Sequence, residues 1–213
     1  MLKLVPLFPL QLVIYPNEIL PLHIFEERYK DMINYCIDNN ESFGLLSYID
    51  QKVSRVGCLC KIDKINKRYE DGRLDIVCRG TDRFMVHSFN SSKAYLQGTI
   101  TAFHDADTVE ESIPGLLERL QDKYDKLLEI ASKNWEDIPD QLPSNSYEFA
   151  HLVGFELAQK QNLLEIKSEN DRLKFLHEHL DRIIPQMKAF EEVQNRIKQN
   201  GHFREFPPLN FNF

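Results

Sequence analysis

The stretch that decides the fold is residues 5–29, VPLFPLQLVIYPNEILPLHIFEERY. It contains two apolar runs, residues 10–15 and 18–24, that are rich in branched side chains and bounded by prolines, a pattern typical of strands at the start or edge of a sheet. A helix is predicted directly after them, ended by Asn39 and Asn40. Its apolar positions recur at helical spacing and are Phe25, Tyr29, Met32, Ile33, Cys36 and Ile37.

Further strands are predicted after this helix. They are residues 43–49, 56–62, 74–78, 84–89 and 95–103. A tight hairpin turn is expected at residues 70–72, Glu-Asp-Gly, because Asp and Gly tolerate the positive backbone angles that such turns need. A break between strands is expected at residues 80–82, Gly-Thr-Asp. So many short antiparallel strands favour a sandwich or a small barrel.

The apolar spacing changes to that of helices from residue 112 onward. Apolar stripes cover residues 113–131 and 149–157, and a third helix is expected to begin near Ser168. Pro185 is expected to kink this last helix or divide it, because proline lacks the backbone donor and crowds the preceding turn. The sequence therefore predicts an α+β protein whose strands come first.

Three parts are expected along the chain, with no Gly- or Ser-rich linker between the first two. They are a β-rich part (residues 1–110), a helical bundle (111–200) and an aromatic C-terminal tail (201–213). The tail has no helical period but carries four phenylalanines. Since burial of aromatic rings is favourable, we expect Phe203, Phe206 and Phe211 to pack back onto the body.

The net charge of −7 opposes a broad nucleic-acid-binding surface, because binding to phosphates needs clustered Lys and Arg. Residues 52–83 nevertheless hold nine basic side chains against five acidic ones. The basic residues are Lys52, Arg55, Lys61, Lys64, Lys67, Arg68, Arg73, Arg79 and Arg83. This excess suits either a polar partner surface, with RNA as one alternative, or long cationic side chains on the wet face of a sheet.

The four cysteines lie at positions that also read as inward-facing apolar sites. They are Cys36, Cys58, Cys60 and Cys78, and we expect them to be buried free thiols in a reducing compartment. Cys58 and Cys60 lack the two-residue gap of a zinc site, so neither a metal nor a cofactor is expected. No apolar run is long enough for a membrane span, and prolines interrupt the N-terminal one. The sequence therefore predicts a cytoplasmic protein.

No arrangement for catalysis is evident in the sequence. No glycine begins a phosphate-cradling loop of the Gly-x-x-x-x-Gly-Lys-Ser/Thr type. His177 and His179 are two residues apart, which places them on different sides of a helix, so a solvated helix face is expected there. His23 precedes two glutamates but has no Ser or Cys nearby, and we expect it to hydrogen-bond at a strand end. We therefore nominate no catalytic residue.

The opening stretch, residues 5–29, resembles the signature of the Lon protease N-terminal, or substrate-binding, domain family. Further similar segments follow in order: FGL at 43–45, GCLCKI at 57–62, DGRLDIVCRGTDRF at 71–84, SYEFA at 146–150, QNLLEI at 161–166 and Arg172-Leu173. Two departures from the family pattern are Asn17, where a glycine is common after the proline, and Glu27, where proline is common. They affect only a turn and a helix start.

The resemblance implies a PUA-like β-barrel followed by a helical part. It also implies a non-catalytic role, because the full protease adds an ATPase module and a Ser-Lys protease module after this domain. Polypeptide clients, unfolded or tagged, or a separate protease are the partners that it suggests. RNA binding through residues 52–83 is the alternative, although nucleic acid is not the expected partner. The sequence leaves the oligomeric state open.

The chain is expected neither to hydrolyse ATP nor to cleave casein, because it has no phosphate-cradling loop and no activated nucleophile. Phosphate release and the appearance of acid-soluble peptides measure the two activities. Turnover above background that persists through repurification would contradict this expectation.

Overall fold

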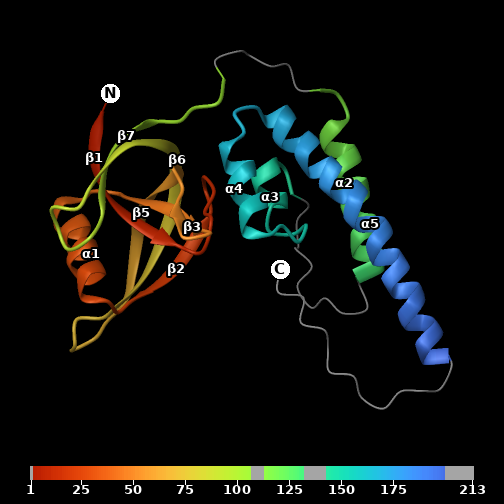
Figure 1. Ribbon diagram of the computed structural model, residues 1–213. Helices are drawn as coiled ribbons and strands as arrows, with labels where there is room; N and C mark the ends of the chain where they lie inside the picture. The colour runs from red at the N-terminus through yellow and green to blue at the C-terminus, as the bar shows by residue number, and fades with distance from the viewer. Residues whose placement is uncertain (1, 107–112, 132–142, 200–213) are drawn as a thin grey trace. The chain divides into compact units, whose positions relative to one another are not determined.

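The structure, a computed structural model, describes residues 2–106, 113–131 and 143–199 (Figure 1). Its contacts divide the chain into two compact units. The barrel unit combines Met1–Asp107 with Leu157–Glu165, and the helical unit combines Thr108–Glu156 with Ile166–Phe213. The expected boundary at residue 110 and the packing of the tail, residues 201–213, lie outside the described residues.

A ring of strands forms the body of the barrel unit. The strands are β1 (Lys3–Leu10), β2 (Ile19–Ile24), β3 (Phe43–Ile49), β4 (Lys52–Val53), β5 (Val56–Arg68), β6 (Leu74–Asn90) and β7 (Gln97–Ala102). Their order is β1-β7-β6-β5-β3-β4, and β1 also pairs with β3, which closes the ring. The expected α+β class, with the strands before the main helices, is confirmed.

The first strand lies earlier than predicted. β1 covers Lys3–Leu10, and residues 11–15 are not a strand, although Val13, Ile14 and Tyr15 are buried. The first half of β1 pairs with β7 and the second half with β3, so each half has one side without a strand partner. Prolines are tolerated at such sides, which explains how Pro6 and Pro9 fit inside this strand.

The predicted break at residues 80–82 is wrong, because β6 runs through it without interruption. A side chain at Gly80 would place its Cβ 2.2 Å from the backbone oxygen of Tyr15, so glycine serves a close approach between two chain segments. The turn predicted at residues 70–72 is confirmed, since Gly72 has a φ of 81° that favours glycine.

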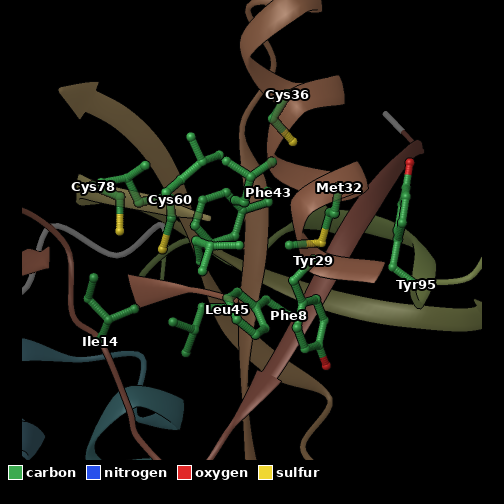
Figure 2. Packing of buried hydrophobic residues seen from close by; sticks show 14 of the residues in the cluster. Phe8, Ile14, Tyr29, Met32, Cys36, Phe43, Leu45, Cys60, Cys78 and Tyr95 are labelled. Atoms are coloured by element: carbon green, nitrogen blue, oxygen red, sulfur yellow. The ribbon is translucent and has the colours of Figure 1, made fainter. Parts of the chain in front are cut away.

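Helix α1 (Glu27–Asn39) covers the barrel core, as its spacing predicts. Its side chains Tyr29 and Met32 point toward Phe8 of β1 and Phe43 of β3 (Figure 2). The rings of Phe8 and Tyr29 lie 4.1 Å apart between centroids. Asn40 ends the helix in the left-handed conformation, and its N–H bonds to carbonyls of the last turn.

Helix α4 (Leu157–Glu165) belongs to the barrel unit although its neighbours in the chain belong to the helical unit. The buried Gln161 side chain accepts a hydrogen bond from Ser47 Oγ (2.7 Å) and donates one to the Val56 carbonyl (3.0 Å). Arg83, also buried, donates to the Leu164 carbonyl at 2.7 Å. Polar side chains from two strands thus bond to α4, a helix that the apolar spacing did not predict.

The helical unit contains α2 (Leu116–Ala131), α3 (Ser146–Phe149) and α5 (Glu169–Gln199). The predicted helical stripe at residues 149–157 is wrong, because α3 ends at Phe149. The helix start predicted near Ser168 is confirmed, because α5 begins at Glu169. The Ser168 hydroxyl accepts a hydrogen bond from the Asp171 N–H in the first turn of this helix. α5 is not divided, since one helix continues through Pro185.

Replacing Gln161 by Ala should lower the free energy of unfolding of the barrel unit by about 1–3 kcal/mol, because Ser47 Oγ and the Val56 carbonyl lose their partner in a buried site. Chemical denaturation of the full chain measures the change. Asn162→Ala is the matched control, since Asn162 is an exposed amide in the same helix. Equal stability of the two variants would show that Gln161 does not hold α4.

Candidate functional site

One end of the barrel unit is a three-stranded sheet, which we call the arm and define as β2, residues 61–68 of β5 and residues 74–79 of β6. β6 is its central strand and pairs with both of the others. In β2 the even-numbered side chains turn toward the core, ending in the buried Ile24. The odd-numbered ones turn to solvent, and they are Ile19, Pro21 and His23, with Phe25 next in the chain.

This outward row of β2 is unusually apolar for a solvent-facing row. Ile19 is 55% exposed and Phe25 is 62% exposed. A half-buried strand normally places polar residues on its wet face. Phe25 was expected to be the first apolar position of the helix that became α1, and to anchor that helix. That expectation is wrong, because the residue precedes α1 and its ring lies against His23, with 6.0 Å between the centroids.

A row of lysines lies on the same outer face of the arm. Lys61 pairs with Arg79, Lys64 with Val77, and Lys67 with Asp75, and these β6 residues in turn pair with the outward row of β2. In a regular strand, residues three apart point to opposite faces. Irregularities between residues 62 and 64 and between 65 and 67 shift the register, so all three lysines share one face.

A hydrogen-bonded group connects β2 to the hairpin of the arm. His23 Nδ1 donates to Asp75 Oδ1 at 2.5 Å, and the Tyr69 hydroxyl donates to Asp75 Oδ2 at 2.7 Å. These two donors, the imidazole first, lower the pKa of Asp75, while the carboxylate raises the pKa of Tyr69. The strand hydrogen bond expected for His23 is confirmed.

The pair of His23 and Asp75 lacks a nucleophile. A carboxylate that accepts from the Nδ1–H of a histidine can orient that histidine as a general base, but no hydroxyl or thiol of the described residues hydrogen-bonds to the other ring nitrogen of His23. Two cations, moreover, lie over the Tyr69 ring, Lys67 at 4.4 Å and Arg73 at 4.8 Å from its centroid. The arrangement stabilises the outer face of the arm and leaves its apolar row exposed.

The basic residues between 52 and 83 do not form one continuous patch. Arg83 is buried and paired with Asp105, and Arg79 pairs with Asp63 at 2.9 Å. Arg68 lies on the opposite face from the lysine row, where it bonds to Asn34. The lysine row of Lys61, Lys64 and Lys67 is gathered on the outer face, beside Arg79 with its partner Asp63.

Other residues singled out in the sequence have structural roles. The solvated face expected for His179 is wrong, because its ring is buried, bonds to the Val153 carbonyl at 2.8 Å and has a pKa lowered by that burial. His177 bonds to the Leu116 carbonyl. The cysteines are buried free thiols as predicted, and burial raises the pKa of Cys36 and of Cys58 to about 12.

Within residues 2–106, 113–131 and 143–199, no group of three or more His, Cys, Asp or Glu side chains is arranged to hold a metal ion. No described helix is both long enough and apolar enough to cross a membrane.

The chain is similar to a known family model and to known proteases. Residues 4–182 match the model of the ATP-dependent protease La (LON) substrate-binding domain. The Lon proteases of Desulfosudis oleivorans and Escherichia coli are each 22% identical over 92% of this chain. The chain spans 26% and 27% of their respective lengths, so the likeness is confined to about a quarter of each protease.

Solved structures agree with this assignment. A Lon N-terminal domain protein from Xanthomonas campestris is 26% identical, with a TM-score of 0.63, and the match covers 82% of this chain and 96% of that one. The N-terminal domain of a Mycobacterium avium complex Lon protease is 19% identical with a TM-score of 0.62, over 84% of this chain and 99% of its own. Together with the match over residues 4–182, these likenesses show that the chain belongs to the Lon substrate-binding domain family.

Proposed function

We propose that this chain is a non-catalytic module that binds unfolded or tagged polypeptide segments on the outer face of the arm. The observation that carries the proposal is the apolar row of β2, in which Ile19 and Phe25 are more than half exposed. Contiguous apolar surface beside polar groups is typical of protein interaction sites. The family name, substrate-binding domain, supports the same role.

The row suits an unfolded segment because its side chains are ready to bury apolar partners. Burying a Phe side chain contributes about 1.5–3 kcal/mol, before the cost of ordering the bound segment. Phe25 stacks on His23, which Asp75 holds in place, so the ring needs little further ordering on binding. Affinity from one or two such side chains is weak, as suits a module that releases its client.

A partner that supplies ATP-driven unfolding and peptide hydrolysis fits this proposal. In the Lon proteases similar to this chain, the matching part is about a quarter of the protein. The proposed module would hold a client segment, and the partner would process it. The contribution of the module itself is binding, which requires no titrating group and no cofactor.

Phe25→Ala should weaken the binding of a denatured protein about tenfold, because the ring supplies the largest exposed apolar area of the row. Fluorescence anisotropy of labelled, reduced and carboxymethylated α-lactalbumin measures the affinity. Phe89→Ala is the matched control, since Phe89 is 41% exposed but lies at the other end of β6 from the arm.

Neither variant should change the melting temperature much, because both rings are exposed. If both variants bind the denatured protein as the parent chain does, the apolar row of β2 is not the client surface. If the parent chain shows no saturable binding up to millimolar concentration, polypeptide binding itself is refuted.

A further inference from the structure

We propose that the lysine row makes the arm selective for acidic segments, so that the preferred client combines apolar side chains with carboxylates. This inference rests on the proposed function, since it names the chemistry of the segment that the arm would bind. Its basis is the register of the arm, which places Lys61, Lys64 and Lys67 on the same face as Ile19, Pro21 and His23.

The two rows are separated by one strand, β6. Neighbouring strands lie about 4.8 Å apart, so the rows are about 10 Å apart. One extended segment can therefore contact the apolar row with one side chain and reach the lysine row with another, because a carboxylate side chain and a lysine side chain together bridge several ångströms. An apolar segment without Asp or Glu would contact the apolar row but form no ion pair with the lysine row.

Two of the lysines are available to a partner. Among the described residues, Lys61 and Lys64 have no hydrogen-bond or ion-pair partner, whereas Arg79 between the rows is already paired with Asp63. Lys67 contacts the Tyr69 ring.

The outer face as a whole is positively charged. It holds four cations, Lys61, Lys64, Lys67 and Arg79, against the two carboxylates Asp63 and Asp75, a formal excess of two positive charges with His23 counted as neutral. The rest of the chain carries the opposite sign, since the total is −7.

Two other occupants fit this face less well. A second copy of the arm would bring one lysine row near another, and like charges facing each other are destabilising. Single-stranded RNA is commonly bound by stacking its bases on several aromatic rings. On this face Lys67 and Arg73 lie over the Tyr69 ring, Ile19 and Pro21 offer no π-face, and only the Phe25 ring, stacked on His23, is widely exposed.

The test measures binding of labelled peptides of about ten residues to the full chain. One peptide alternates Glu with Val, a second alternates Lys with Val, and an oligouridine of similar length represents RNA. The parent chain should bind the Glu/Val peptide about tenfold more tightly than the Lys/Val peptide, because two exposed charge pairs change from attraction to repulsion. This ratio should approach one as NaCl rises from about 0.05 M to about 0.5 M.

Three variants identify the residues responsible. The double variant Lys61→Glu/Lys64→Glu should reverse the preference toward the Lys/Val peptide, and Lys61→Gln/Lys64→Gln should abolish it. Lys52→Glu, an equal change of charge per site on β4, should retain the preference of the parent chain. Circular dichroism of each variant verifies that the barrel unit is folded.

The outcomes separate this inference from the proposed function. If denatured protein binds through Phe25 but the two peptides bind equally well, or if Lys61→Glu/Lys64→Glu leaves the ratio unchanged, selectivity by the lysine row is overturned and polypeptide binding stands. Tighter binding of oligouridine, lost in the same double variant, would overturn it in favour of RNA. If neither peptide nor denatured protein binds, both proposals fail.

Discussion

The pairing of three strands with β6 is the constraint on which the barrel unit depends. β5 and β7 pair with it in the barrel, and β2 and β5 pair with its first residues in the arm. β6 can belong to the barrel and to the arm only if it continues without a break where the two meet, near Gly80. The junction is crowded, because the backbone of Tyr15 approaches Gly80 so closely that a Cβ there would overlap it. A glycine at this position therefore allows one strand to build both the barrel and the arm.

The outer face of the arm follows from this pairing together with the irregularities of β5. The register shifts at residues 62–64 and 65–67 turn three lysines toward the same side, while Ile62 and Ile65 remain packed against the core. Apolar and cationic side chains are thus brought to one face by main-chain geometry. The hydrogen bonds of Asp75 with His23 and Tyr69 then connect β2 to the hairpin. A rigid face of this kind suits binding with little reorganisation.

Helix α4 illustrates a different use of polar side chains. Gln161 and Arg83 are buried. Gln161 bonds to Ser47, the Val56 carbonyl and Glu165, and Arg83 bonds to the Leu164 carbonyl and Asp105. Because an unpaired buried polar group is costly, such contacts fix one position of the helix on the strands more selectively than apolar packing alone. The chain therefore leaves the helical unit for nine residues, packs on the barrel unit and returns.

The sequence by itself determined that a β-rich part precedes the helical part, helix α1 with its Asn40 end, the hairpin turn at Gly72, the buried thiols and the family. Each of these is encoded by residues close in the chain, through periodicity or turn chemistry. Only the tertiary structure decided that β6 is continuous, that α4 packs on strands and that Phe25 is exposed. It also decided that the lysines share a face, since a spacing of three predicts alternating faces unless bulges intervene. These features depend on pairing between distant segments, which no local pattern specifies.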